Sequence, residues 1–204
     1  AIVCNAGILR DKAFHNQSED DWDQVVAVHL KGCFTVLHAA WPQLRKQRYG
    51  RVVLCTSSTG LFGNFGQSNY GAAKAGMIGL MNTLKLEGEK YDIRVNTIGP
   101  SAYTRMTEGL MSAEQNAALS PEHVATVVAV LASRDCPDSG VILEAMAGRI
   151  SRAAIVRGRG IDYDASKPRD PDWIAAHWDQ ITSLEGAQMM WSLGESLEKH
   201  QGRS

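Results

Sequence analysis

The sequence predicts an α/β fold, in which a doubly wound parallel sheet carries helices on both faces. Two observations lead to this prediction. Short apolar runs alternate with long amphipathic segments, and the runs stop at Asn, Ser or Gly, as buried parallel strands do before a loop. The 204 residues are 44% hydrophobic and 21% charged, a composition that suffices for the core of one domain.

Four strands are expected. The first apolar run covers residues 1–4 and stops at Asn5-Ala6-Gly7. The others cover residues 52–55, 93–98 and 140–146. Each is short and mostly apolar, which is typical of a strand that is covered on both sides.

Three long helices are expected between and after these strands. Ser18 and Asp21 have the spacing of a capping box and predict a helix that runs to about Arg48, with a kink at Pro42 as one alternative. A glycine-punctuated loop over 60–66 then leads to a second helix over 69–90. Its near side carries small residues, and a third helix begins after Ser120.

The last part of the chain differs in composition. Residues 149–169 are basic and loop-like, Asp170-Pro171 predicts a short helix, and another helix follows toward Lys199. We therefore expect two parts. Residues 1–147 form the sheet domain, and residues 148–204 form an extension that packs on it or on a partner subunit.

Composition excludes several classes of function. The 21 basic and 22 acidic residues give a net charge of −1 with no basic stripe, so we expect no nucleic-acid partner. No stretch of eighteen apolar residues and no secretory signal is visible, so we expect no membrane partner and a cytoplasmic location. The cysteines lack metal or disulfide spacing and are read as core residues in a reducing compartment: Cys4, Cys33, Cys55 and Cys136.

Tyr70 and Lys74 form the first candidate catalytic pair. They are four residues apart on an expected helix, so their side chains emerge on the same face. A free phenol has a pKa of about 10, and a nearby ammonium favours the phenolate. The pair is therefore interpreted as a proton donor and acceptor, and the alternative is a half-buried tyrosine beside a solvated lysine.

Ser57 extends this pair into a constellation. It lies thirteen residues before Tyr70, at the carboxyl end of an expected parallel strand, where open α/β sheets bind their ligands. Its hydroxyl can hydrogen-bond a substrate oxygen while Tyr70 exchanges the proton. The alternative is that Ser57 only satisfies amides at the strand end.

These motifs, in this order, resemble the short-chain dehydrogenase/reductase family, whose pattern is matched by Asn5-Ala6-Gly7, by Ser57 with Tyr70 and Lys74, and by Asn96 to Pro100. The resemblance covers about residues 1–147 and implies a Rossmann-like fold. Further strings resemble the (3R)-hydroxyacyl-CoA dehydrogenase subgroup, which occurs in the peroxisomal D-bifunctional protein and its bacterial relatives; they begin at Gly7, Tyr49, Gly63 and Arg105.

The resemblance implies a site and a cofactor. Tyr70 would pass the proton to or from the substrate, Ser57 would position the substrate oxygen, and Lys74 would also hold the nicotinamide ribose. NAD is the expected cofactor, with NADP as the alternative. Besides Tyr70 and Lys74, the residues implied to contact it are Asn5, Ala6, Gly7, Pro100, Ala102, Tyr103, Thr104 and Arg105.

His29 departs from the wider family pattern, in which an asparagine at this position helps to relay protons to the lysine. A histidine at this position resembles the variant found in the (3R)-hydroxyacyl-CoA dehydrogenase subgroup. We assign His29 a supporting catalytic role. The alternative is a satisfied core histidine, since His29 falls on the buried side of its helix.

The glycine-rich phosphate turn and the acidic residue that normally bind a dinucleotide are missing from the sequence. Together with a first residue that is Ala1 and already reads as strand, this predicts an N-terminally truncated domain that lacks three strand–helix units, about 90 residues. The expected function is hydride transfer between a nicotinamide cofactor and a secondary alcohol, with (3R)-hydroxyacyl-CoA as substrate, in a homodimer. The alternatives are a short-chain dehydrogenase for another carbonyl substrate or a truncated, non-enzymatic subunit. If the chain belongs to a eukaryotic multifunctional enzyme, its expected location is the peroxisome.

Overall fold

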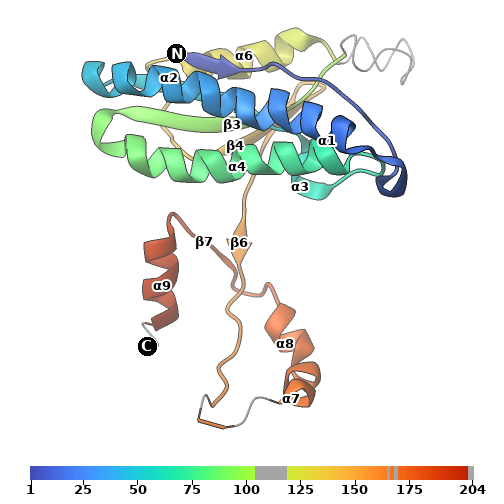
Figure 1. The fold of residues 1–204 in the computed structure, drawn as a ribbon. Helices are drawn as coiled ribbons and strands as arrows, with labels where there is room; N and C mark the ends of the chain where they lie inside the picture. Colours follow the sequence, from blue (N-terminus) through green and yellow to red (C-terminus); the bar gives the residue numbers. More distant parts are fainter. Residues whose placement is uncertain (104–118, 165, 168–169, 202–204) are drawn as a thin grey trace. The chain divides into compact units, whose positions relative to one another are not determined.

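The structure is a computed structural model that describes residues 1–103, 119–164, 166–167 and 170–201 (Figure 1). The chain divides into two compact units, Ala1–Ala153 and Ala154–Ser204, and each is described by itself.

The first unit contains a five-stranded sheet in the order β1-β2-β3-β4-β5. The first four strands are mutually parallel and confirm the four predicted ones: β1 (Ile2–Cys4), β2 (Gly50–Cys55), β3 (Ile93–Ser101) and β4 (Ile142–Met146). The Rossmann-like parallel arrangement is thus confirmed.

Strand β5 (Arg149–Ala153) corrects the expectation of a basic loop that begins at Arg149. It pairs antiparallel with β4, with Met146 opposite Arg149. The two residues between them, Ala147 and Gly148, have φ of 47° and 77°, the left-handed pair that a two-residue hairpin requires. This tight turn, rather than the composition of the segment, directs it back along the sheet.

The helical segment after Ser18 begins as predicted, but its irregularity lies at residues 27–31 and not at Pro42. The Ser18 Oγ accepts from the Asp21 amide at 3.1 Å, and the Asp21 carboxylate accepts from the Ser18 amide at 3.3 Å, which confirms the capping box. Helix α1 (Glu19–Val26) passes into a π-helical turn, η2 (Ala27–Lys31), and then into α2 (Gly32–Gln47).

Pro42, the alternative kink position, lies inside α2. The departure from α-helical geometry occurs instead at η2, which carries the buried His29. A π-helical turn accommodates one extra residue in the helix and reorients the side chains around it. Proline is therefore not the cause of the irregularity in this segment.

The remaining helices cover both faces of the sheet. Helix α4 (Ser68–Gly88) lies with α1 and α2 on one face, and α6 (Pro121–Ala132) lies on the other (Figure 1). Alternate residues of β2 accordingly enter different cores. Val52 and Leu54 pack with residues of α2 and α4, whereas Val53 and Cys55 pack with residues of α6.

Short helical turns complete the first unit: η1 (Phe14–Asn16), α3 (Ser58–Phe62) and η3 (Glu89–Tyr91). Helix α3 occupies the start of the segment expected as a glycine-punctuated loop. Ser57 caps α3, because its Oγ accepts from the Thr59 amide at 3.1 Å.

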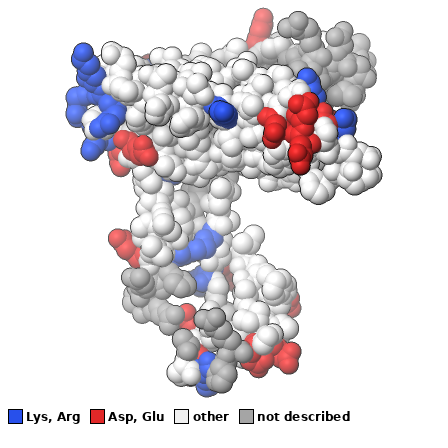
Figure 2. All heavy atoms as spheres, viewed as in Figure 1, with Lys and Arg blue, Asp and Glu red and all other residues white. Residues whose placement is uncertain are grey.

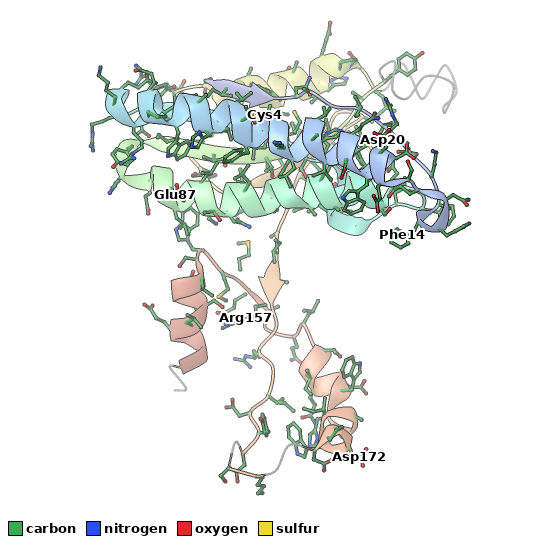
Figure 3. All side chains as sticks on the ribbon, in the orientation of Figure 1. Cys4, Phe14, Asp20, Glu87, Arg157 and Asp172 are labelled. Carbon is green, nitrogen blue, oxygen red and sulfur yellow. The ribbon has the colours of Figure 1, made fainter. Side chains whose placement is uncertain are left out.

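The second unit is small and open. Strands β6 (Val156–Arg157) and β7 (Gln188–Met189) pair antiparallel, with helices α7 (Pro171–Ala176), α8 (Trp178–Thr182) and α9 (Leu193–Gln201) around them. Arg157, labelled in Figure 3, donates to the Ser196 carbonyl at 2.6 Å and to its hydroxyl at 2.7 Å. Asp170 caps α7, as its sequence context predicts.

Charged side chains on the first unit gather near two helix ends, the end of α2 and the start of α1. In Figure 2, Lys and Arg side chains gather where α2 ends, and Asp and Glu side chains gather around the start of α1. This pattern complements the helix dipoles. Among the described residues, no helix is long and apolar enough to cross a membrane, and no cluster of His, Cys, Asp and Glu could hold a metal ion.

Candidate active site

Four of the candidate residues come together at one edge of the sheet. Ser57 follows the carboxyl end of β2, Tyr70 and Lys74 lie in the first turns of α4, and His29 lies in η2. The Ser57 side chain lies close enough to the Tyr70 phenol to lower its pKa through a hydrogen bond. The Lys74 Nζ lies 5.4 Å from the centre of the Tyr70 ring, and the His29 ring meets that ring edge-on at 5.2 Å.

Lys74 is held by the end of β2 and is only 4% exposed. Its ammonium donates to the Cys55 carbonyl, and its own carbonyl accepts from the Thr56 hydroxyl at 2.7 Å. Gly60 of α3 approaches so closely that a Cβ there would lie 2.8 Å from the Lys74 Cβ. Burial lowers the pKa of Lys74, because an ammonium loses solvation in this position.

Tyr70 is half-buried, and burial raises the pKa of its phenol above the ordinary value, which the hydrogen bond from Ser57 partly offsets. This differs from the expectation that Lys74 moves the Tyr70 pKa toward neutrality. The physical reason is placement, since the ammonium bonds to the Cys55 carbonyl and lies over the ring. The neutral phenol is therefore the favoured form in the free chain.

His29 is 1% exposed, and burial lowers its pKa, so the imidazole is held neutral. Its Nε2 lies 3.0 Å from the Ile8 amide nitrogen and 2.8 Å from the Ile8 carbonyl oxygen. Its Nδ1 is buried with no hydrogen-bond partner among the described residues. At Gly7, a Cβ would lie 2.6 Å from the His29 Cε1, so only glycine lets the chain pass this close to the ring.

The cofactor-contact candidates lie at the same sheet edge. Asn5 and Ala6 are exposed just beyond β1, Pro100 lies near the end of β3, and Ala102 and Tyr103 follow β3. Thr104 and Arg105 lie outside the described residues.

The groups at this sheet edge match one end of a nicotinamide cofactor. The chemistry present suits its nicotinamide-ribose end, with an exposed segment beyond β1, a hydroxyl pair at Ser57 and Tyr70, and a buried ammonium at Lys74. The His29 Nδ1, which has no hydrogen-bond partner among the described residues, leaves one further polar atom at this edge. The residues therefore fit that end of the cofactor, while the phosphate-binding turn is not in this sequence.

The family model described as short chain dehydrogenase matches residues 1–117. The chain belongs to this family. Helix α4 with Tyr70 and Lys74, the end of β2 with Ser57, and the Asn5-Ala6-Gly7 segment all fall within the match.

Relatives in the short-chain dehydrogenase family extend the likeness to most of the chain. A short-chain type dehydrogenase/reductase of Mycobacterium tuberculosis is 50% identical over 92% of this chain and 65% of its own length. The mouse peroxisomal multifunctional enzyme type 2 is 42% identical over 96% of this chain and 27% of its own. The chain thus spans less than two thirds of these relatives.

A solved structure supports the same family membership. The full-length peroxisomal multifunctional enzyme type 2 of Drosophila melanogaster matches with a TM-score of 0.90 and 37% identity, over 98% of this chain and 37% of that one. The resemblance to this subgroup, made on short sequence strings, is therefore confirmed.

Four residues at this candidate site were not singled out from the sequence: Thr56, Ser58, Asn69 and Glu144. Thr56 and Asn69 are completely buried beside Lys74 and Tyr70, and the Ser58 hydroxyl donates to the Glu144 carboxylate at 2.6 Å. Adjacency to catalytic candidates could have singled out Thr56 and Asn69. Glu144 gave a weaker signal, as an acidic residue in an apolar strand.

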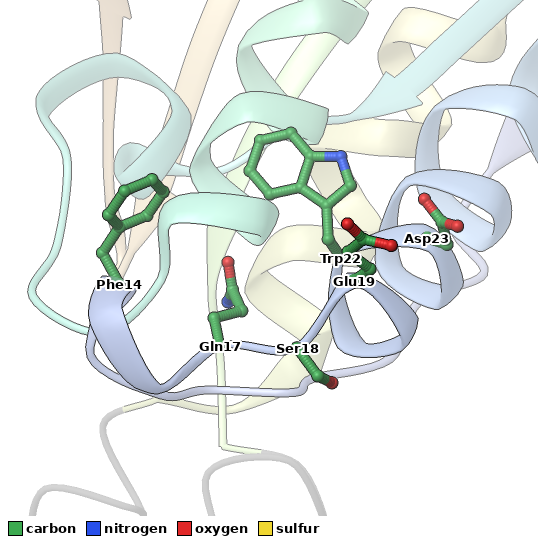
Figure 4. Close-up of a pocket in the computed structure, with 6 residues that line it drawn as sticks. All are labelled: Phe14, Gln17, Ser18, Glu19, Trp22 and Asp23. Atoms are coloured by element: carbon green, nitrogen blue, oxygen red, sulfur yellow. The ribbon is translucent and has the colours of Figure 1, made fainter.

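A surface hollow lies beside the start of α1 (Figure 4). Figure 4 shows Phe14 and Trp22 on either side of it, and the other lining residues are Gln17, Ser18, Glu19 and Asp23. None of these six residues belongs to the Ser57, Tyr70 and Lys74 set.

Proposed function

We propose that this protein transfers a hydride between a secondary alcohol or ketone and a nicotinamide cofactor. The observation that carries the proposal is the meeting of Ser57, Tyr70 and Lys74 at the carboxyl edge of a parallel sheet. Open α/β sheets bind ligands at this edge. A phenol, a hydroxyl and an ammonium there can manage a proton on a substrate oxygen.

The chain's own part in the reaction is proton control. In oxidation, the hydroxyl proton of the alcohol passes to Tyr70, and its C–H bond breaks as the hydride leaves. The products are a ketone, a proton and the reduced cofactor. When bound, the nicotinamide supplies the acceptor or donor of the hydride. Ser57 holds the substrate oxygen, and the Lys74 ammonium, 5.4 Å from the centre of the Tyr70 ring, favours the phenolate.

The raised pKa of Tyr70 gives this proposal a direction. The neutral phenol is the proton donor that ketone reduction requires, whereas alcohol oxidation requires the phenolate. Oxidation is therefore expected to be favoured by alkaline pH, and reduction by neutral pH.

The proposed substrate is a (3R)-hydroxyacyl-CoA thioester, oxidised to the 3-oxoacyl-CoA. Its support is the similarity to peroxisomal multifunctional enzymes and to the peroxisomal hydratase-dehydrogenase-epimerase of Neurospora crassa, 43% identical over 92% of this chain. A second candidate is a 3-oxoacyl ester of acyl-carrier protein. The reductase of that name from Thermotoga maritima is 43% identical over 65% of this chain.

We further propose NAD as the cofactor, with NADP as the alternative. We also propose a supporting role for His29, because it hydrogen-bonds the Ile8 backbone beyond β1. A homodimer is proposed because Phe34 and Val36 of α2 are 53% and 51% exposed. The cytoplasm is proposed for a stand-alone form, and the peroxisome for a form within a multifunctional enzyme.

The test is NAD reduction by the full-length protein supplied with (3R)-hydroxyacyl-CoA. Tyr70→Phe is expected to lower kcat by about 10²-fold or more, because the proton acceptor is lost. Tyr91→Phe, at a surface tyrosine that accepts from Arg45, serves as the matched control. Undiminished turnover in Tyr70→Phe, or no saturable NADH binding at all, would overturn the proposal in favour of the non-enzymatic subunit.

A further inference from the structure

Asn69 immediately precedes Tyr70 and is completely buried, with 0% exposure. Its Oδ1 accepts from the Tyr70 amide at 2.7 Å. Amides in the first turn of a helix have no intrahelical acceptor, and Gln67 provides no side-chain cap to α4. Asn69 therefore supplies the acceptor for the amide of the proposed proton-transfer residue itself.

The other end of the Asn69 amide reaches two separate segments. Its Nδ2 donates to the Arg10 carbonyl and to the Asp21 carbonyl, each at 3.2 Å. An amide nitrogen has two hydrogens, so both are used. One acceptor lies in the segment that leaves β1, and the other lies in the first turn of α1.

These two acceptors are themselves fixed. The Asp21 carboxylate bonds the Lys12 ammonium at 2.7 Å and closes the capping box with Ser18. The Lys12 amide donates to the Gly66 carbonyl at 2.9 Å, just before α4. One buried amide thus joins the start of α4, the start of α1 and the segment that follows the proposed cofactor residues.

We propose that Asn69 is a positioning residue for Tyr70, which sets the phenol against Ser57 and the segment after β1. This inference rests on the proposed function. Misplacement of a reacting group by 1 Å can cost about 10²-fold in rate. Water cannot replace these bonds at a fully buried amide, so their loss is expected to shift the first turn of α4.

Asn96 provides a matched control for a purely structural role. It is also 0% exposed, its Nδ2 donates to the Asp138 carbonyl at 2.9 Å, and its Oδ1 accepts from the Val141 amide at 3.0 Å. Its partners lie in the connection into β4. Asn69→Asp and Asn96→Asp therefore remove the same kind of donor from equally buried amides, and only the first acts next to Tyr70.

The experiment compares the two variants in the full-length protein with NAD and (3R)-hydroxyacyl-CoA. Both are expected to lower the melting temperature. Asn69→Asp is expected to lower kcat by about 10- to 100-fold with KM changed less than about threefold, and to shift the pH profile of kcat. Asn96→Asp is expected to keep kcat per folded molecule within about twofold.

A wild-type kcat and pH profile in Asn69→Asp, or an equal loss of kcat in Asn96→Asp, would overturn the assignment. Should Asn69→Asp not fold, Asn69→Ser is judged by the same kcat and pH criteria. These outcomes differ from failure of the proposed function, in which wild-type protein shows no turnover or Tyr70→Phe remains fully active.

Discussion

Lys74 and Cys55 are joined by a hydrogen bond from the lysine ammonium to the carbonyl of the last residue of β2. Lys74 lies two turns inside α4, so this bond connects the helix of the proposed proton donor to the sheet edge. Lys74 is 4% exposed, and burial lowers the pKa of its ammonium. A buried charge costs stability, which indicates that its placement serves chemistry more than folding.

Replacement of Lys74 is predicted to separate activity from stability. Lys74→Met should lower kcat by about 10²-fold or more, because no ammonium remains to favour the phenolate. The melting temperature should stay the same or rise, because a buried charge is replaced by an apolar chain of similar length. Lys31→Met, at an exposed position of η2, is the control and should change neither quantity. A Lys74→Met protein with full turnover would contradict the prediction.

His29 predicts a pH dependence of stability. Its folded pKa is lowered below the ordinary value, so the unfolded chain binds the proton more readily as pH falls through about 6.5. Stability should therefore rise with pH between about 5 and 7, with a slope from this residue of up to about 1.4 kcal/mol per pH unit.

Urea unfolding at several pH values measures that slope. His29→Asn should remove it, while His38→Asn, at an exposed residue of α2, should retain it. An unchanged slope in His29→Asn would show that other groups determine the acid sensitivity.

Gly60 and Gly79 predict opposite effects of the same substitution. Both lie in α-helices, α3 and α4, but a Cβ at Gly60 would lie 2.8 Å from Lys74 and from the Ala75 nitrogen, whereas one at Gly79 meets nothing within 4 Å. Gly60→Ala should destabilise the protein by about 1–3 kcal/mol through overpacking. Gly79→Ala should stabilise it by about 0.5–1 kcal/mol. Chemical denaturation measures both, and a neutral Gly60→Ala would show that α3 can move away from α4.

Ser58 and Glu144 predict a measurable coupling energy. Their hydrogen bond is short, at 2.6 Å, charge-assisted and half-buried. A double-mutant cycle with Ser58→Ala and Glu144→Ala should give about 1 kcal/mol of interaction. Because Ser58 directly follows Ser57, the Ser58→Ala variant should also raise KM. A coupling energy near zero would mean that the contact does not hold the start of α3.

Short-range features of this protein could be predicted from the sequence. The Ser18–Asp21 capping box, the apolar runs of the four parallel strands, and the presence of Tyr70 and Lys74 on one helix face are all found as predicted. Each depends on residues within about four positions of one another, where helix and strand periodicity fixes the geometry. Ser57 lies thirteen residues before Tyr70, outside this range, so its place beside the pair was predicted from the family resemblance and from its position at the end of a strand.

The sequence by itself therefore determined the four parallel strands and the main helices, and it singled out Ser57, Tyr70 and Lys74 as candidates for acid–base chemistry. Only the tertiary structure decided the environment of these residues. His29 contacts Ile8, 21 residues away in the sequence, and Ser58 contacts Glu144, 86 residues away. The Ala147-Gly148 turn brings a basic segment into the sheet. The direction of the Tyr70 pKa was decided in the same way. Desolvation and hydrogen-bond partners depend on what packs around a group, and that is set by segments distant in the chain.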